Sequence, residues 1–422
     1  MNVSTMRKID RRLGVPGCLC LTLWRRLADL VGRRRLGPTG KILLVKLAEQ
    51  GSTVLAAPAI RRAVALVGRQ NVYFLCFEEN RFILDVMGLV PPENVLTIRT
   101  GGLPAVLAGA WSAIRRARRI GIDSAVDLEF FARSSAALCY LSGARRRVGL
   151  HSFGGEAAYR GDLMTHRLSF NPHMHTSQFF QVMVEALQAK VEDLPALPLP
   201  IPPLAEVAEK FLPLPEDLQA VRQMLKLPGD AAGGATCRLI VLNPNCSDLL
   251  PQRAWAPQRY VELARGLLAQ DAHCRIVFTS GPSEAAPTAA LAQQVGSDRV
   301  ICLAGRTTLR QVLTLYCLAD VLVTNDSGPA HFASLTPVDV VVLFGPETPK
   351  LFAAVSPRSH VLYAGIACSP CVSAYNDRLV PCDNNLCLQA ITVEGVLQAV
   401  GEVLRQRAAR QAGPAPERAS TR

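Results

Sequence analysis

The sequence lacks an apolar run long enough to cross a bilayer. The apolar run nearest the N-terminus, residues 18–24, is far shorter than the roughly 20 residues that a spanning helix needs. A secretory signal with a small-residue cleavage site is also missing, and we therefore expect a cytoplasmic protein. Charged residues make up only 19% of the chain against 49% hydrophobic residues, a composition that excludes general disorder.

The middle of the chain has almost no net charge. The formal charge is +12, but residues 1–40 carry nine Arg and Lys against two Asp, and residues 404–422 carry five Arg against one Glu. The two ends therefore hold eleven of the twelve excess charges. Binding of nucleic acid across a broad face would need a basic stripe on the fold itself, so we expect no nucleic-acid partner.

The arm formed by residues 1–40 interleaves apolar and basic side chains. Leucines and Trp24 alternate there with Arg25, Arg26 and the arginines at 33–35. This pattern suits an interfacial helix on anionic lipid, which predicts peripheral contact with the inner face of the inner membrane. A solvated basic extension fits the same residues equally well.

Thirteen cysteines are present, and most stand singly in apolar runs, as Cys76 does. Such residues are predicted to be core thiols in a reducing compartment. Four others, Cys368, Cys371, Cys382 and Cys387, are spaced Cys-x2-Cys-x10-Cys-x4-Cys. Four thiols can close a tetrahedral zinc site, but these gaps are not those of the common fingers. We therefore favour structural thiols and predict neither a metal nor another cofactor.

Strand and helix patterns alternate along two stretches, residues 41–193 and 204–403. In the first, an apolar run at 41–47 precedes a polar turn and a helix, and similar units follow in both stretches. Repeated alternation of this kind predicts an α/β protein with parallel sheets. Residues 194–203 contain five prolines and are predicted to link the two domains. Residues 404–422 are predicted to form a basic, disordered tail.

The individual elements follow from the same patterns. We expect strands at 41–47, 72–77, 95–98, 125–128, 147–149, 238–242, 275–279, 300–303 and 321–324, and helices at 54–67, 104–119, 257–268, 283–295 and 309–318.

The most informative segment follows the apolar run that ends at residue 323. It reads Thr324, Asn325, Asp326, Ser327, Gly328, Pro329, Ala330, His331. A β-branched run that enters a small polar turn and then a helix is the corner at which open α/β sheets bind phosphates. Pro329 suits a first helical turn, where an N–H is not needed. The amides of Ser327 and Gly328, with His331 beside them, therefore predict a diphosphate site.

Together with an apolar run at 338–343 and Phe344-Gly345-Pro346, this segment resembles the signature of glycosyltransferase family 9, the bacterial ADP-heptose:lipopolysaccharide heptosyltransferases. The resemblance extends over about residues 41–400. It implies a GT-B architecture, with two facing Rossmann-like domains, the donor in the C-terminal one and the acceptor entering from the N-terminal one. It also implies inverting transfer of a sugar from a nucleotide diphosphate, by resemblance ADP-heptose, to a lipopolysaccharide or other surface-glycan acceptor.

The resemblance assigns donor-binding roles to several residues. Arg253, two positions before Trp255, matches a basic residue that contacts the donor phosphate, and an arginine fork can hold two phosphate oxygens. Glu284 matches the acid that meets the nucleoside ribose. Asp326 would repel a diphosphate, so we expect it to orient loop amides or a sugar hydroxyl. His331 is expected to donate to the leaving phosphate.

The acceptor loop departs from the family pattern. Family members usually carry Gly-Asp after the first strand, with the aspartate as the proposed base, whereas this chain has Gly51-Ser52. A serine hydroxyl needs another group to take its proton. Glu49 and Glu129 are the candidate bases, and we favour Glu49 slightly because a loop readily absorbs a two-residue shift. The alternatives are a nucleotide-sugar epimerase or hydrolase, and a donor-binding protein that has lost its base.

Overall fold

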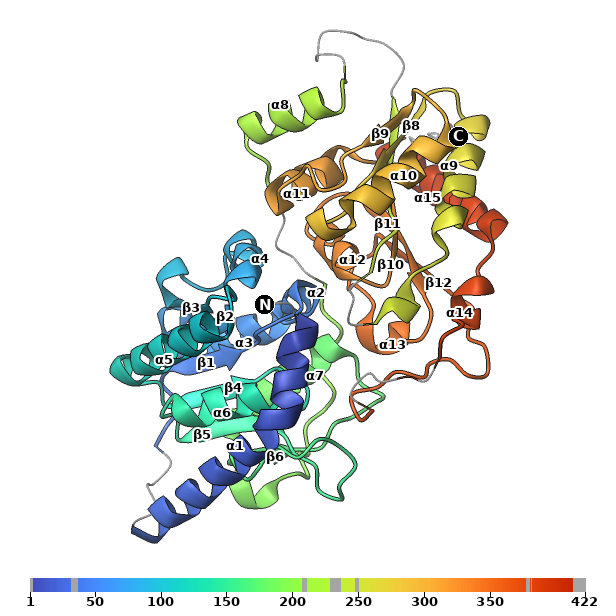
Figure 1. Ribbon diagram of the computed structural model, residues 1–422. Helices are drawn as coiled ribbons and strands as arrows, with labels where there is room; N and C mark the ends of the chain where they lie inside the picture. The colour runs from blue at the N-terminus through green and yellow to red at the C-terminus, as the bar shows by residue number, and fades with distance from the viewer. Residues whose placement is uncertain are drawn as a thin grey trace, which may run out of the picture.

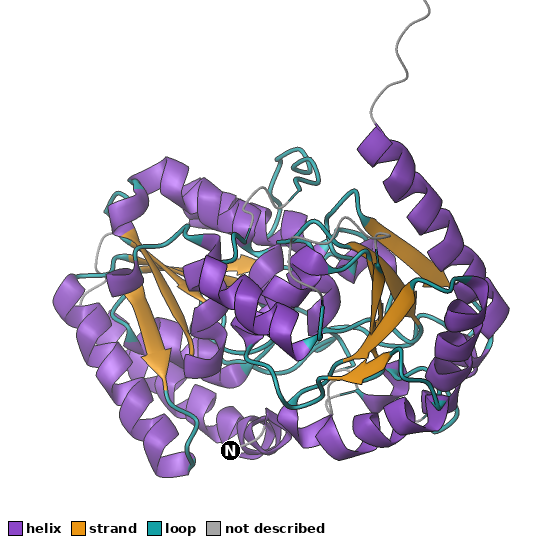
Figure 2. Ribbon diagram, turned by 90° about the horizontal axis from the view of Figure 1, so that it is seen from above, coloured by secondary structure: helices purple, strands orange, loops and turns teal. Residues whose placement is uncertain are grey.

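The computed structural model describes residues 3–31, 37–206, 211–227, 237–246, 250–376, 380 and 382–412. Two six-stranded parallel sheets, each with helices around it, form the protein (Figures 1 and 2). The predicted α/β class with parallel sheets is therefore confirmed.

The first sheet has the strand order β3-β2-β1-β4-β5-β6. Its strands are β1 (Ile42–Val45), β2 (Val72–Phe77), β3 (Val95–Ile98), β4 (Ser124–Asp127), β5 (Arg146–Leu150) and β6 (His166–Leu168). Every residue of β1 is buried, because β1 lies inside a parallel sheet that helices cover on both faces. The strands expected at 72–77 and 95–98 have the bounds that the sequence predicted, whereas β6 was not anticipated.

The second sheet has the order β12-β11-β10-β7-β8-β9. Its strands are β7 (Arg238–Asn243), β8 (Cys274–Phe278), β9 (Val300–Cys302), β10 (Val321–Asn325), β11 (Asp339–Phe344) and β12 (Ser359–Tyr363). Both orders are those of doubly wound sheets, in which ligands bind outside the carboxyl ends of the strands where the winding reverses. In these sheets the reversal lies between β1 and β4 and between β7 and β10.

The helices complete two α/β units. They are α1 (Val3–Val31), α2 (Gln50–Leu55), α3 (Ala57–Val67), α4 (Arg81–Met87), α5 (Leu103–Ile120), α6 (Arg133–Leu141), α7 (Thr176–Glu185), α8 (Pro215–Met224), α9 (Pro257–Gln270), α10 (Ala285–Val295), α11 (Leu309–Leu318), α12 (Gly328–Ala333), α13 (Pro349–Phe352), α14 (Leu386–Gln389) and α15 (Val393–Ala412). The helix expected at 54–67 is divided at Ala56 into α2 and α3.

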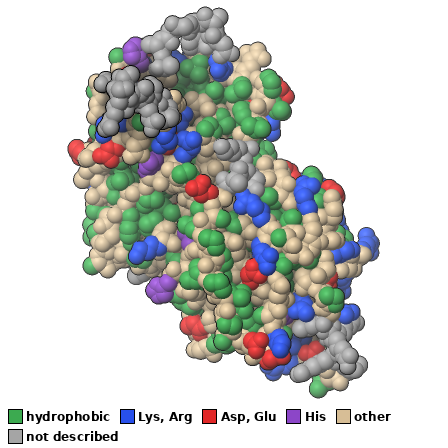
Figure 3. All heavy atoms as spheres, turned by 180° about the vertical axis from the view of Figure 1, so that it is seen from behind, with side chains coloured by type: hydrophobic (Ala, Val, Ile, Leu, Met, Phe, Trp, Pro, Cys, Tyr) green, Lys and Arg blue, Asp and Glu red, His purple; other side chains and the backbone are tan. Residues whose placement is uncertain are grey.

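The two units share a continuous apolar core. One cluster of buried residues contains Val54 and Phe131 from the first unit together with Ala330 and Phe352 from the second. A separate cluster, which includes Cys18 of α1, packs α5 and α6 on the other face of the first sheet. On the face seen in Figure 3, Lys and Arg are scattered among Asp and Glu and do not form one stripe.

The chain ends differ from the expectations. The predicted disordered tail is wrong for residues 404–412, because α15 continues through Ala412. Arg407 and Arg410 on this last part of α15 form ion pairs with the fully buried carboxylate of Asp339. Residues 413–422 lie outside the described residues. At the other end, one face of α1 packs against α6 in the first unit.

Candidate active site

The loop after β1 and the corner after β10 meet at the centre of the molecule. Helices α2 and α12 lie side by side there, one from each unit (Figure 1). Gly51 approaches His331 so closely that a Cβ at Gly51 would lie 2.5 Å from the ring carbon Cδ2. A second contact joins the units nearby, since the imidazole of His175 lies 3.0 Å from the carbonyl oxygen of Ala353. The predicted acceptor loop and the predicted donor corner therefore share one site.

The donor corner has the predicted strand-turn-helix form. β10 ends at Asn325, and α12 begins at Gly328 with Pro329 in its first turn. The first N–H groups of a helix have no partner within that helix, so the amides around Ser327 and Gly328 can receive an anion. The hydroxyl groups of Thr324 and Ser327 are 3.4 Å apart and buried, which fixes the turn.

Asn325 holds this corner in place through both ends of its side-chain amide. Its Oδ1 accepts hydrogen bonds from Trp255 N at 3.0 Å and from the Tyr260 hydroxyl at 3.1 Å. Its Nδ2 donates to the carbonyl oxygens of Pro244, at 2.9 Å, and Asn245, at 3.3 Å. Because these bonds tie β10 to the loop after β7 and to α9, we assign Asn325 a positioning role in the donor site.

Arg253 lies between two buried carboxylates. Its Nη1 is 3.2 Å from Glu347 Oε2 and 3.8 Å from Asp326 Oδ2. The acids follow adjacent parallel strands, β11 and β10, so the sheet itself brings them together. Two carboxylates fix the direction of one guanidinium.

Glu347 was not among the predicted site residues. It follows Phe344-Gly345-Pro346, the second motif of the family signature, and only 2% of the residue is exposed. The signal in the sequence is an acid directly after the second motif. Because buried carboxylates require partners, such an acid is a candidate member of a polar site.

Glu284 lies at the other side of the donor half, after β8, where it is half-buried and accepts a hydrogen bond from Ser283 at 2.6 Å.

His331 is a neutral imidazole at neutral pH. Burial lowers the pKa of His331 to about 4, His175 and Arg253 act in the same direction, and Glu49 opposes them. Among the described residues, the Nδ1 atom of His331 has no hydrogen-bond partner, although it is buried. A neutral ring carries one N–H, which suits a hydrogen bond to a phosphate oxygen.

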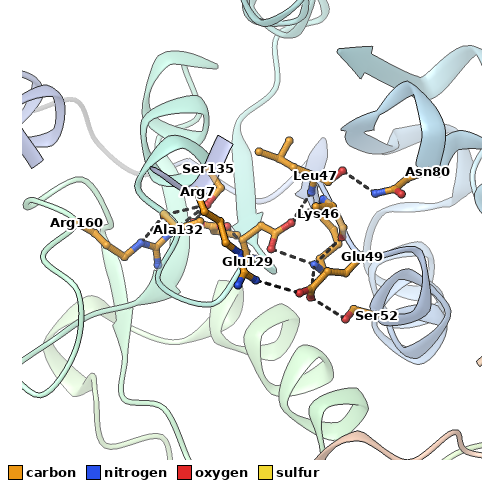
Figure 4. A network of polar contacts seen from close by, with 12 residues as sticks. Arg7, Lys46, Leu47, Glu49, Ser52, Asn80, Glu129, Ala132, Ser135 and Arg160 are labelled. Carbon is orange, nitrogen blue, oxygen red and sulfur yellow. Dashed lines mark hydrogen bonds and ion pairs between the residues drawn. The ribbon is translucent and has the colours of Figure 1, made fainter. Parts of the chain in front are cut away.

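The Glu49 carboxylate on the acceptor loop contacts the side chains of Arg7, Ser52 and Lys46 (Figure 4). Its Oε1 accepts from Arg7 Nη2 at 3.3 Å, and its Oε2 accepts from the Ser52 hydroxyl at 3.2 Å and lies 3.5 Å from Lys46 Nζ. Two cations, Arg7 and Lys46, therefore lie beside the carboxylate. Its backbone has φ 65°, in the left-handed region that a glutamate rarely adopts. Strained conformations of this kind cluster at functional sites.

Glu129 serves a different purpose. Its Oε1 accepts from the backbone N–H groups of Leu47, at 2.7 Å, and Ala48, at 2.9 Å, while Oε2 accepts from Lys46 Nζ at 3.0 Å (Figure 4). These contacts use the carboxylate to shape the loop that carries Glu49. The two candidate bases therefore have different contacts, and Ser52 donates a hydrogen bond to Glu49.

The four spaced cysteines differ in exposure. Cys368 and Cys371 are exposed, Cys382 is half-buried and Cys387 is buried. Within the described ranges, no group of three or more His, Cys, Asp or Glu side chains is arranged to hold a metal ion.

A model of one family matches the chain over residues 114–379, under the description glycosyltransferase family 9 (heptosyltransferase). The chain belongs to glycosyltransferase family 9. That match covers the donor corner, Arg253 and the second motif, and it ends before residue 382.

Curated members of family 9 match parts of the chain. Lipopolysaccharide heptosyltransferase 2 of Salmonella typhimurium is 31% identical over 114 residues, 26% of this chain and 32% of the relative. Lipooligosaccharide heptosyltransferase 2 of Campylobacter jejuni is 24% identical over 174 residues, 40% of this chain and 51% of the relative. The matches therefore span a third to a half of these relatives.

Solved structures of family 9 share the fold over nearly the whole chain. The E. coli ADP-heptose lps heptosyltransferase II superposes with a TM-score of 0.64 at 18% identity, covering 87% of this chain and 99% of that one. The family 9 glycosyl transferase from Veillonella parvula DSM 2008 gives a TM-score of 0.66 at 17% identity, covering 89% and 100%. The predicted GT-B fold is confirmed by these superpositions.

Proposed function

We propose that this family 9 protein is an inverting glycosyltransferase that moves a sugar from a nucleotide diphosphate, with ADP-heptose as the first candidate, to a lipopolysaccharide or other surface-glycan acceptor. The observation that carries the proposal is the meeting of the two loops. The Glu49 carboxylate stands on the loop that contains Gly51, and Gly51 contacts His331 in the donor corner. A base and a leaving-group site are thereby brought to one place. The heptosyltransferase relatives support the choice of donor and acceptor.

The reaction would be a single displacement. The acceptor hydroxyl attacks the anomeric carbon on the face opposite the diphosphate and gives its proton to a Glu49 oxygen. As the new C–O bond forms, the bond between the anomeric carbon and the phosphate oxygen breaks, and its electron pair leaves with the nucleoside diphosphate. One displacement inverts the configuration at that carbon. Ser52 and Lys46 hold the carboxylate in position for this step.

The donor corner would stabilise the departing diphosphate. The amides of Ser327 and Gly328 and the N–H of neutral His331 follow the carboxyl end of β10, and we propose that they meet the negative charge that develops on the diphosphate. Arg253 adds a guanidinium fork, which can neutralise phosphate oxygens without a metal ion. We assign Asp326 and Glu347 to orienting Arg253 and receiving sugar hydroxyls, and Glu284 to the ribose.

We place the acceptor in the unit of residues 41–193 and the donor in that of residues 204–403, with residues 194–203 as the linker. Among the described helices, none is both long enough and apolar enough to cross a membrane. A lipid-linked acceptor nevertheless brings the reaction to a membrane surface. We therefore propose a cytoplasmic enzyme with peripheral contact to the anionic inner face of the inner membrane.

Nucleotide release with and without acceptor tests the function. A thermal-shift panel of nucleotide sugars first identifies the donor, since a specific donor raises the melting temperature in proportion to its occupancy. Release that requires heptose-deficient lipopolysaccharide supports transfer. Equal release without acceptor indicates a hydrolase, isomerised donor without release indicates an epimerase, and a thermal shift without any turnover indicates a donor-binding protein.

A further inference from the structure

Helix α1 presents an apolar stripe to solvent. Leu19, Leu23, Trp24, Leu27 and Leu30 recur at helical spacing, and their exposed fractions run from 48% for Leu19 to 83% for Leu30. A helix on the surface of a globular protein normally turns its apolar face inward. This stripe faces outward, and contact with water gives no reason for apolar side chains at these positions.

The opposite face of α1 attaches the helix to the first unit. Cys18 and Thr22 are buried against the first unit, and Thr22 Oγ1 accepts from the backbone N–H of Asp162 at 2.8 Å. Asp10 accepts from the first amides of α6, those of Arg133, at 3.1 Å, and Ser134, at 2.7 Å. These contacts hold α1 in one orientation, so the stripe is a fixed surface.

A groove of about 2010 Å³ opens beside the stripe, between the C-terminal half of α1 and the ends of α5 and α6. Trp24 and Leu27 line one wall of it. Six arginines and two aspartates are among the residues that line the groove, which gives it a strong positive charge. The arginines are Arg25, Arg118, Arg145, Arg146, Arg147 and Arg167.

Three of these guanidinium groups have no carboxylate partner in the described part of the chain. Arg118 donates to Leu141 O at 2.7 Å, Arg146 to Leu187 O at 2.9 Å, and Arg147 to Leu163 O at 2.6 Å. Arg147 is buried, and burial is the main cause that lowers its pKa. Carbonyl oxygens orient a guanidinium but do not neutralise it, so these groups favour an anion in the groove.

We infer that the α1 stripe and the arginine groove together form a docking site for an anionic phospholipid bilayer. The apolar side chains would enter the boundary between headgroups and acyl chains, while the groove would receive lipid phosphates. An apolar stripe beside a cationic groove matches an amphiphile with an acidic head, because each half of the surface meets its complement. The inference gives the proposed membrane contact a defined site and does not depend on the transfer reaction.

Vesicle binding by the full chain tests the inference. Wild-type protein should co-sediment with phosphatidylcholine vesicles containing phosphatidylglycerol and bind pure phosphatidylcholine vesicles at least about tenfold more weakly. The triple variant Leu23→Ser/Trp24→Ser/Leu27→Ser should lose at least about tenfold in affinity for the anionic vesicles. The matched variant Leu199→Ser/Ile201→Ser/Leu204→Ser, also exposed, should bind as wild type does. Equal binding by the two triple variants would overturn the assignment of the α1 stripe as the docking surface.

The charge of the groove is tested separately. Arg118→Glu/Arg145→Glu should remove the preference for anionic vesicles, whereas Arg306→Glu/Arg405→Glu, with the same net charge, should keep it. Retained preference in the first variant would overturn the groove as the headgroup site.

Fluorescence supplies a readout of the stripe itself. In a Trp111→Phe background only Trp24 and the buried Trp255 remain, and a blue shift on anionic vesicles places Trp24 in lipid. Self-association of the wild type in sedimentation velocity, without vesicle binding, would overturn the inference in favour of a second copy on the stripe. Transfer to a soluble acceptor would be unchanged in that case, so the proposed function would stand.

Discussion

Replacing Gly51 with alanine perturbs a close contact between the loop after β1 and the corner after β10. The new methyl would lie 2.5 Å from His331 Cδ2. Non-bonded carbons rest at about 3.5–4.0 Å, so α2 and α12 must separate by roughly 1 Å. Overpacking of this kind typically costs about 1–3 kcal/mol. A misplacement of about 1 Å between base and leaving group can lower the rate about 100-fold.

The assays are urea unfolding and acceptor-dependent nucleotide release. Gly101→Ala is the matched control, because its methyl would meet only Ala105 Cβ at 3.9 Å. The double variant Gly51→Ala/His331→Ala removes the ring that the methyl strikes, so it should recover stability while its activity stays low. Wild-type stability and rate in Gly51→Ala would refute the contact between the acceptor loop and the donor corner.

Three further predictions concern titratable side chains. Arg407→Gln should lower the free energy of unfolding by about 1–3 kcal/mol, because it weakens the pairing of the buried Asp339, whereas Arg405→Gln on the exposed side of α15 should be nearly neutral in urea unfolding. The folded pKa of His331, about 4, lies below its ordinary value of 6.5, so stability is complete above pH 6.5 and is lost as the pH falls toward 4. Between pH 7 and pH 5 this group should cost about 2 kcal/mol in urea unfolding, and His331→Gln should remove that component. Arg253→Lys should weaken donor binding by about tenfold or more in calorimetry, since an ammonium cannot replace the fork; unchanged affinity would remove Arg253 from the donor site.

Strands were the most predictable part of the fold. Buried parallel strands are short, nearly continuous apolar runs, so β2 and β3 were found at their observed bounds. The docking of α1 depends on Asp10 and Thr22 meeting groups far along the chain, and local patterns do not contain such contacts. The same holds for α15, whose last turns are held by a buried acid more than 60 residues earlier, Asp339.

The candidate site also has one part that the local sequence predicts and another that depends on contacts between distant residues. The donor corner follows from a local motif, so its strand, turn and helix were predictable from residues 319–331. The separate roles of Glu49 and Glu129 were not, because they depend on which carboxylate meets the amides of Leu47 and Ala48. The sequence left both acids as candidate bases, and the contacts of Glu129 with the loop favour Glu49 in the proposal.

The central claim is that Glu49 replaces the usual aspartate base, and acceptor-dependent turnover of Glu49→Gln tests it most directly. The variant keeps the size of the side chain and loses its basicity, so kcat should fall at least about 100-fold while donor affinity is retained. Glu129→Gln, the matched control, should lower the melting temperature and leave most of the kcat. A wild-type kcat in Glu49→Gln would contradict the account.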